Sequence, residues 1–202
     1  MPELPEVETT VRGLKPLVGS VVLNIKIHTP KLRFIIPKNI LLLKRGNIIK
    51  NIKRIGKCIV ISFSNNHCIV LHLGMSGRII LIKSKKFIKK KHDHFIISTN
   101  KEQIMIFNDP RRFGFIDYDL IEKIYKRKYI LNLGIDALSK SLNVDYLMFK
   151  INKSIVPIKQ ILLDQRIIVG IGNIYASEIL FDAKISPLEI GKDLNKLQYN
   201  KL

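Results

Sequence analysis

Cysteine is scarce in this chain of 202 residues, which contains only Cys58 and Cys68. Two thiols cannot supply the four ligands of a structural zinc site, and they cannot build a disulfide scaffold. Both cysteines lie in apolar runs typical of strands, which indicates buried, reduced thiols. We therefore expect no metal site formed by this chain's own residues.

Long uncharged apolar runs are also missing. No stretch reaches the roughly 18 apolar residues that a membrane-spanning helix needs. The N-terminal segment MPELPEVETT is acidic and has no apolar core, which disfavours secretion. We therefore expect a cytoplasmic protein that has no membrane partner.

Acidic residues are outnumbered, because 16 Asp and Glu stand against 35 Lys and Arg, a formal net charge of +19. Such a surplus favours a polyanionic partner, since each cation placed on a phosphate releases a condensed counterion. The abundance of Ile, Lys and Asn also fits the drift of an AT-rich genome. Charge alone therefore leaves nucleic-acid binding and compositional bias equally open.

Short apolar runs of strand character follow an N-terminal helix. Apolar residues recur at helical spacing within 2–18, and Gly19 ends that segment. Strict alternation predicts a strand at 21–27, with Val21, Leu23, Ile25 and Ile27 on one face. Further β-like runs lie at 48–55, 58–63, 68–73, 78–82, 94–99, 104–107 and 113–118. About eight closely spaced strands predict an antiparallel sandwich or barrel.

The pattern becomes helical after about residue 120. Helical segments are predicted at 120–131, 143–152, 156–164, 173–183 and 194–202. We therefore expect an α+β chain with a β-rich domain at 1–131 and an α-rich domain at 132–202. The basic cluster from Lys83 to Lys91 is predicted to be an exposed loop.

A glycine-rich turn, Gly170-Ile171-Gly172-Asn173, precedes one of these helices. It lacks the third glycine and the βαβ unit of a dinucleotide site. We interpret it as a tight turn with Asn173 as the helix N-cap, a terminus that can hold a phosphate. A plain capped turn remains the alternative.

Pro2 carries the most specific chemistry in the sequence. Initiator Met is normally removed before a small residue, which would leave proline as a terminal secondary amine with a pKa of about 7.7–8. Attack on a sugar C1′ would give an iminium ion that acidifies C2′ and promotes loss of the 3′ phosphate. Glu3 could protonate the ring oxygen, and Glu6 could order Glu3. Pro and Glu are also favoured in the first turn of a helix, so the motif alone does not distinguish a catalytic role from a structural one.

Several motifs occur in order along the chain and resemble the bacterial formamidopyrimidine-DNA glycosylase family, which repairs 8-oxoguanine. They are Met1–Thr9 (MPELPEVET), Arg54–Lys57 (RIGK), His72–Gly77 (HLGMSG), Lys91–His94 (KHDH), Asn108–Gly114 (NDPRRFG) and Gly170–Glu178 (GIGNIYASE). They extend over nearly the whole chain. The resemblance implies an N-terminal helix plus antiparallel β-sandwich, followed by a helix–two-turn–helix domain that binds DNA.

The resemblance also assigns roles to matching residues. Pro2 would form the Schiff base, Glu3 would act as general acid with Glu6 in support, and Lys57 would serve β-elimination. Three side chains would fill the space left by the extruded nucleotide: Met75, Arg111 and Phe113. Five would hold flanking phosphates: His92, Arg112, Lys153, Lys159 and Asn173. The base would be excised first, and the abasic strand would then be cut by β,δ-elimination.

The expected partner is damaged double-stranded DNA, bound by a monomer in the bacterial cytoplasm near the nucleoid. The family carries one structural zinc in a C-terminal finger with four cysteines, whereas this chain ends at Leu202 without a C-x-x-C pair. We therefore expect a C-terminally truncated family member, either a partial sequence or the product of a decaying gene.

Two alternatives remain open at this stage. The first is a DNA-binding remnant with little or no turnover, because the missing finger would supply further phosphate contacts. The second is the sister family that removes oxidised pyrimidines. Leu4 argues against it, because that group resembles this motif with glycine at the same place.

Overall fold

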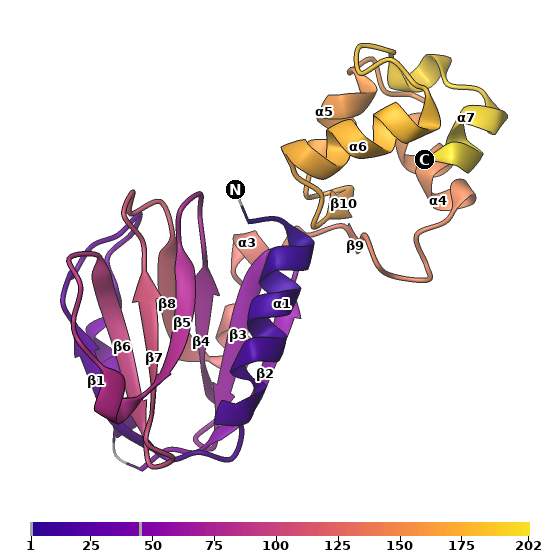
Figure 1. Cartoon of the computed structure of the whole chain (residues 1–202). Helices are drawn as coiled ribbons and strands as arrows, with labels where there is room; N and C mark the ends of the chain where they lie inside the picture. The colour runs from indigo at the N-terminus through magenta and orange to yellow at the C-terminus, as the bar shows by residue number, and fades with distance from the viewer. Residues whose placement is uncertain (1, 45) are drawn as a thin grey trace. The chain divides into compact units, whose positions relative to one another are not determined.

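An N-terminal helix and two four-stranded antiparallel sheets form the first of two units in this chain (Figure 1). The structure is a computed structural model that describes residues 2–44 and 46–202, so Met1 and Arg45 lie outside the described residues. The first unit is Met1–Ile130 and the second is Leu131–Leu202.

Helix α1 (Leu4–Leu14) begins at a capping box and buries one apolar face formed by Leu4, Val7, Val11 and Leu14. It is shorter than the predicted 2–18, because the chain changes to a 3-10 turn, η1 (Lys15–Leu17), around Pro16. Proline has no N–H to continue the helical ladder. Its buried face packs on strands of both sheets, which fixes the first residues of the chain to the sandwich.

The first sheet has the order β1-β6-β7-β5 and the second has the order β2-β3-β4-β8. The strands of the first sheet are β1 (Val22–Ile27), β6 (Asp93–Thr99), β7 (Gln103–Asn108) and β5 (Arg78–Lys83). Those of the second are β2 (Ile49–Ile55), β3 (Cys58–Phe63), β4 (His67–His72) and β8 (Phe115–Leu120). The main core lies between the sheets, because inward residues of both, such as Phe95 and Ile61, belong to one apolar cluster. The predicted eight-stranded sandwich is confirmed.

The predicted alternation in the first strand is wrong at one end. Val22 is buried, whereas Leu23 is 58% exposed. The register between β1 and β6 shifts between Val22 and Asn24, so an extra residue turns Leu23 outward. Periodicity alone cannot reveal such a bulge.

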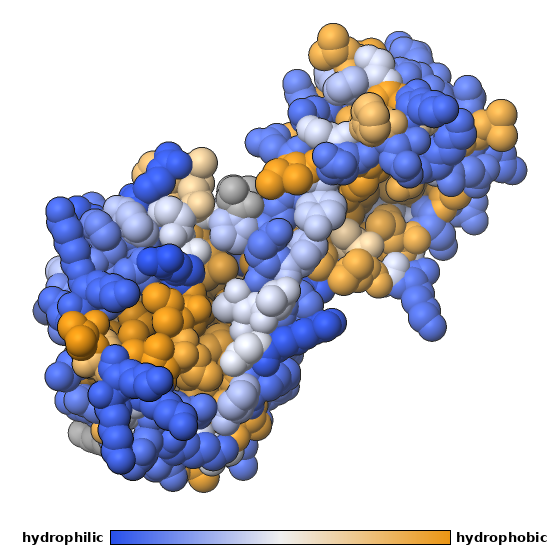
Figure 2. Space-filling view, in the orientation of Figure 1, coloured by the Kyte–Doolittle hydropathy of each residue, from blue (hydrophilic) through white to orange (hydrophobic). Residues whose placement is uncertain are grey.

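The two outer faces of the sandwich differ. Two short helices, α2 (Ile121–Tyr125) and α3 (Lys128–Leu131), replace the predicted single helix 120–131 and form an apolar cluster with side chains of β3, β4 and β8. On the other sheet, outward isoleucines and Phe87 form a separate cluster. Figure 2 shows an apolar area over β6, β7 and β5, bordered by hydrophilic residues. The 3-10 segments η2 (Lys38–Lys44) and η3 (Ser84–Lys86) complete the unit.

The second unit is helical around its own apolar core. Its helices are α4 (Val144–Ile151), α5 (Ile158–Leu163), α6 (Asn173–Ala183) and α7 (Lys196–Lys201), with the 3-10 turn η4 (Gly191–Asp193). The two-residue strands β9 (Ile135–Asp136) and β10 (Ile168–Val169) pair in parallel, a ladder that the sequence did not predict. The predicted α+β class, with helices after the sandwich, is confirmed. Among the residues that the structure describes, no helix is long and apolar enough to cross a membrane.

Candidate active site

The first residues of the chain are held by reciprocal capping. Glu3 is the N-cap of α1, and its backbone N–H donates to Oε2 of Glu6 at 2.9 Å. Glu3 is only 1% exposed, whereas Pro2 immediately before it is half-buried. Glu6 therefore orders the backbone of Glu3, and the arrangement fixes a buried carboxyl group beside residue 2.

Lys57 lies in the hairpin turn between β2 and β3, where Ile55 pairs with Cys58. Gly56 has φ of +57°, the left-handed region that a two-residue turn with glycine first requires. Burial lowers the pKa of Lys57, and the nearby carboxylate of Glu3 opposes that shift. The fold therefore brings Glu3 and Lys57 together, although 54 positions separate them.

Arg54 supports this hairpin, and the sequence analysis did not identify that role. Its Nε donates to Oε2 of Glu8 at 3.1 Å, and its other guanidinium nitrogen donates to the carbonyl of Gly56 at 3.0 Å. The Arg54 side chain is 10% exposed. A partly buried ion pair thus connects α1 to the turn that carries Lys57.

His72 ends β4 opposite Cys58 and was also missed as a separate site residue. Burial lowers its pKa to about 4, with smaller contributions from Arg33 and Lys57. The N–H of Gly74 donates to its Nδ1 at 3.0 Å, and its ring stacks on Phe115 with centroids 5.2 Å apart. His72 is therefore neutral near pH 7, with Nε2–H as its donor. A histidine at a strand end before a glycine-rich loop was the available signal.

Met75 and Phe113 are apolar but not core residues, since each is 45% exposed. They lie on the loop after β4 and the loop before β8. The guanidinium carbon of Arg111 lies 4.7 Å from the ring centroid of Phe113, a cation–π contact. The structure therefore groups Arg111 with Phe113 at an exposed position.

The two residues predicted to hold phosphates in this unit, His92 and Arg112, lie beside and within the loop before β8. The carbonyl of His92 accepts the N–H of Asp109 at 3.1 Å. Arg112 is exposed and has φ of +55°, an uncommon conformation for a residue other than glycine. Such a conformation costs roughly 1 kcal/mol or more and is concentrated at functional sites.

In the second unit, Lys159 and Asn173 belong to the helices α5 and α6. Nζ of Lys159 donates to Oγ of Ser177 at 3.0 Å, and Ser177 in turn donates to the carbonyl of Asn173 at 2.8 Å. A serine one turn inside α6 therefore connects the two predicted phosphate contacts. No pattern in the sequence predicts this role for Ser177. Lys153 is exposed in the turn after α4.

Asn173 is not the helix N-cap, which corrects the prediction. Gly172 has the extended backbone of an N-cap, and its carbonyl accepts the first helical hydrogen bond, from Ala176. Asn173 is the first helical residue, and it is exposed. The glycine adopts the cap conformation, so the amide side chain of Asn173 lies at the surface of the helix start.

Gln165 holds the turn between α5 and α6. Its Oε1 accepts the N–H of Gly170 at 3.0 Å, and its Nε2 donates to the carbonyls of Leu163 and Ile171. Gly170 has φ of +113°, which a side chain would oppose. One side-chain amide thus fixes the turn that leads to Asn173, a role that no periodic pattern indicates.

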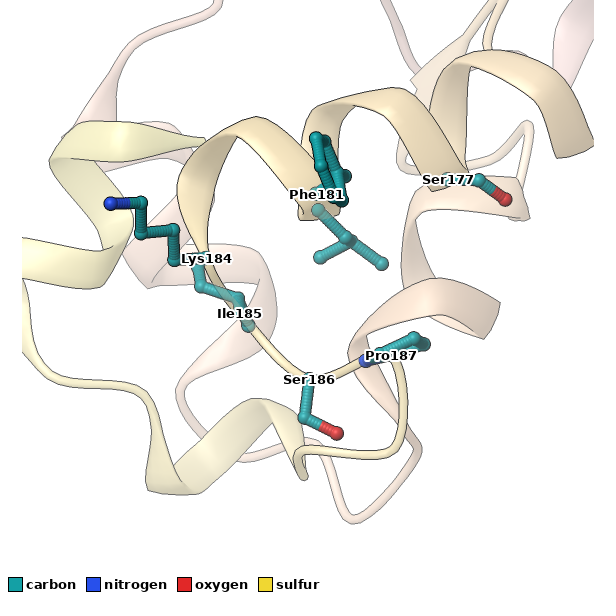
Figure 3. A pocket seen from close by; sticks show the side chains of 7 residues that line it. Ser177, Phe181, Lys184, Ile185, Ser186 and Pro187 are labelled. Carbon is teal, nitrogen blue, oxygen red and sulfur yellow. The ribbon is translucent and has the colours of Figure 1, made fainter.

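A hollow of about 520 Å³ lies beside the second half of α6 (Figure 3). Its lining is largely apolar and includes Phe181, which is 84% exposed, together with Pro187 in the following loop. None of the predicted site residues lines it. An apolar hollow does not suit a phosphate, although Ser177, which accepts a hydrogen bond from Lys159, is one of its lining residues.

The residues present do not fit the zinc that the sequence resemblance implies for the family. Cys58 and Cys68 are buried in the apolar cluster of the second sheet, and burial raises the pKa of each thiol to about 12. Such thiols stay protonated and are poor metal ligands. Across residues 2–44 and 46–202, no group of three or more His, Cys, Asp or Glu could hold a metal ion.

Family models match both units. Residues 1–116 match the formamidopyrimidine-DNA glycosylase N-terminal domain, and residues 133–202 match the formamidopyrimidine-DNA glycosylase H2TH domain. The chain is 43% identical over 197 residues to a formamidopyrimidine-DNA glycosylase of Rickettsia bellii, covering 96% of this chain and 71% of that protein. A Zymomonas mobilis protein of the same name is 42% identical, with 96% and 72% covered.

Solved structures of the Lactococcus lactis enzyme Fpg are similar as well. A complex with DNA containing an abasic site has a TM-score of 0.88 at 27% identity, covering 98% of this chain and 74% of that one. A complex with DNA containing a FAPY-dG lesion has a TM-score of 0.89 at 27% identity, with 98% and 76% covered. The similarity therefore extends over both units of the chain.

Proposed function

Because this chain belongs to the formamidopyrimidine-DNA glycosylase family, we propose that it excises oxidised purines from duplex DNA and then cuts the strand at the abasic site. The substrates would be 8-oxoguanine and formamidopyrimidines. The observation that carries the proposal is the buried Glu3 carboxyl group beside residue 2, with the half-buried Lys57 nearby. Residues 1–131 would perform the chemistry, and residues 132–202 would bind the DNA backbone.

Pro2 is the nucleophile in this proposal. After removal of Met1 it carries a terminal secondary amine, and the unprotonated form of that amine is the attacking group. The nitrogen bonds to C1′, the glycosidic bond breaks, and the base leaves with the bonding electrons and takes up a proton. The adduct loses the amine proton, and the sugar ring opens to an iminium ion that cannot relax to a neutral imine.

Glu3 supplies the proton for ring opening. Its carboxyl group is buried, and the capping bond to Glu6 fixes its backbone. Protonation of the ring oxygen makes that oxygen a neutral leaving group as the C1′=N bond forms. A general acid that is fixed next to the nucleophile avoids the entropy loss of a free reactant.

Lys57 and His72 act on the sugar and its phosphates in the second stage. The iminium charge acidifies C2′, a C2′ proton is removed, and the 3′ phosphate departs; a second elimination releases the 5′ phosphate. Lys57 contributes a cation of lowered pKa, and neutral His72 contributes an Nε2–H donor. Hydrolysis of the remaining adduct by water regenerates the Pro2 amine.

DNA binding follows from the exposed groups. Met75, Arg111 and Phe113 would replace the stacking and pairing of the everted nucleotide, since eversion costs a few kcal/mol. Flanking phosphates would be held by His92, Arg112, Lys153, Lys159 and Asn173. The formal charge of +19 supports this partner. The protein would act as a monomer on nucleoid DNA in the bacterial cytoplasm.

Borohydride trapping on an abasic-site duplex tests the proposal. Borohydride reduces the iminium ion, so the wild-type protein should gain the mass of the DNA strand. Pro2→Gln, whose large side chain keeps Met1 in place, should give no adduct. Pro5→Ala is the matched control, because it removes a proline of the same turn without touching the terminal amine, and it should be trapped as the wild type is.

Binding without an adduct would contradict the enzyme assignment and leave the DNA-binding remnant. Competition between 8-oxoguanine and oxidised-pyrimidine duplexes tests the substrate class. Faster excision of the pyrimidine lesion would assign the protein to the sister specificity instead.

A further inference from the structure

Two loops of the N-terminal unit touch through their backbones. The first, 73–77, carries Met75, and the second, 109–114, carries Arg111 and Phe113. Gly74 has φ of +63°, and a Cβ atom there would lie 2.5 Å from the amide nitrogen of Gly114. Any side chain at Gly74 would therefore separate the loops.

Asp109 joins these loops through its side chain. It is completely buried. Its Oδ1 accepts the hydroxyl of Ser76 at 2.5 Å, and its Oδ2 accepts the N–H of Gly114 at 2.8 Å. Oγ of Ser76 in turn accepts the N–H of Arg111 at 3.1 Å. One carboxylate thus bonds the residue after Met75, and through that residue it is connected to Arg111.

The backbone of Asp109 is anchored to the sandwich. Its carbonyl accepts Nε2–H of His94, a buried residue of β6, at 2.8 Å. A carbonyl can only accept, so Nε2 carries the proton. In the neutral ring the hydroxyl of Thr29 then donates to Nδ1, at 2.8 Å. The connection between the loops therefore rests on His94 of β6 in the first sheet.

We propose that Asp109 and Ser76 are a positioning pair that fixes Met75 relative to Arg111 and Phe113, so that the three side chains enter the duplex as one unit. This inference rests on the proposed function. A buried carboxylate is stable only when donors satisfy it, and here the donors come from both loops. Neither residue touches the DNA in this account. They act by holding the loops in the geometry that eversion of the damaged nucleotide needs.

If Asp109 and Ser76 position the void-filling side chains, their loss should affect base excision and abasic-site cleavage differently, which a purely structural role would not do. An intact damaged base must be unstacked and its space filled before excision. An abasic sugar has no base to unstack, so its cleavage depends on Pro2, Glu3 and Lys57 and much less on the void-filling side chains. Loosening the loops should therefore slow base excision and spare cleavage at a preformed abasic site.

The test uses the full chain and three variants under single-turnover conditions. Ser76→Ala removes the bridge, and Ser76→Thr keeps a hydroxyl at the same position. Ser64→Ala is the matched control, because Oγ of Ser64 also accepts a backbone N–H, that of Ile48, but in the turn between β3 and β4. The substrates are an 8-oxoguanine·C duplex and a duplex with a preformed abasic site.

Ser76→Ala should lower the excision rate about tenfold or more, since small misplacements at a site have effects of this size. Abasic-site cleavage should stay within about twofold, and Ser76→Thr and Ser64→Ala should excise like the wild type. Equal loss on both substrates, no loss on either, or failure of Ser76→Thr to restore excision would overturn the inference. If the wild-type protein itself cannot cleave the abasic duplex, the proposed function is wrong. That outcome differs from failure of the inference, which is judged from the variants of an active wild type.

Discussion

The proposed catalytic residues of the N-terminal unit and the proposed phosphate contacts of the C-terminal unit lie in opposite environments. In the N-terminal unit Glu3 is buried, and burial lowers the pKa values of Lys57 and His72. In the C-terminal unit Asn173 is exposed at the start of α6, and Nζ of Lys159 donates to Ser177 on the neighbouring helix. Proton transfer and nucleophilic attack require groups whose pKa values differ from those in water, whereas a phosphate contact requires accessible donors.

This contrast predicts two kinds of variant. Changes in the buried cluster formed by Glu3, Lys57 and His72 should lower kcat with little effect on DNA affinity. Changes at the helix ends should weaken binding and leave the rate at saturating DNA unchanged.

The largest effect is expected for Glu3→Gln. Loss of the proton donor should lower the single-turnover excision rate about 10²–10⁴-fold, the usual contribution of a positioned general acid. Duplex affinity, measured by fluorescence anisotropy, should change less than about threefold. Glu6→Gln is the control, because it retains an oxygen that can accept the N–H of Glu3. A similar rate for Glu3→Gln and the wild type would remove the buried cluster from the chemistry.

The next largest effect concerns stability and pH. The unfolded chain binds a proton at His72 with a pKa of 6.5, whereas the folded chain does so only at about 4. Protonation therefore favours unfolding, and the free energy of unfolding should fall by up to about 3 kcal/mol as the pH falls from 6.5 to 4. His72→Gln keeps an acceptor for Gly74 but does not titrate. Denaturant titrations at each pH give the free energy of unfolding, which should change less steeply with pH in the variant than in the wild type. Equal changes with pH would contradict the burial of a neutral ring.

A third prediction concerns the turn of the C-terminal unit. Gln165→Leu removes the partner of three backbone groups, each left at least partly buried. Stability of this unit should fall by about 1–3 kcal/mol. Hydrogen exchange at the amide of Gly170 should accelerate while exchange in β3 and β4 stays slow. Gln160→Leu, at an exposed position of α5, is the control, and equal acceleration in both variants would exclude a specific role for Gln165.

The smallest effect is expected for Lys159→Ala. The dissociation constant for duplex DNA should rise roughly three- to tenfold at low salt, and the slope of log K against log salt should decrease by about 1. The excision rate at saturating DNA should not change. Lys140→Ala, which removes an exposed lysine from the loop before α4, controls for general charge. A lower rate at saturation would show that the two units do not divide binding and chemistry in this way.

Much of the fold could be predicted because its signals are local. Runs of Ile and Val between turn residues located all eight strands of the sandwich within a few residues. The errors lie where geometry departs from periodicity: the bulge that exposes Leu23 and the break of the first helix at Pro16. The two-residue strands β9 and β10 are too short to leave a pattern.

The site was predictable only in part. Pro2 and Glu3 stand out because terminal amine chemistry can be inferred from a few adjacent residues. The hydrogen bonds of Arg54 with Glu8 and of Asp109 with Ser76 join residues that lie far apart in the sequence, and the charge of Lys57 contributes to the lowered pKa of His72. No periodicity encodes such contacts. Asn173 was misplaced by one position, because Gly172 can adopt the cap conformation as well as asparagine can.

Lys57 is the main alternative to Pro2 as the nucleophile, because it is also an amine, its pKa is lowered, and it lies near Glu3. Proteolysis of the borohydride-reduced adduct and peptide mass spectrometry would identify the nitrogen bonded to C1′. The account predicts the adduct on the nitrogen of Pro2, in a peptide that begins at residue 2. An adduct on Nζ of Lys57, or a peptide that still carries Met1, would contradict it.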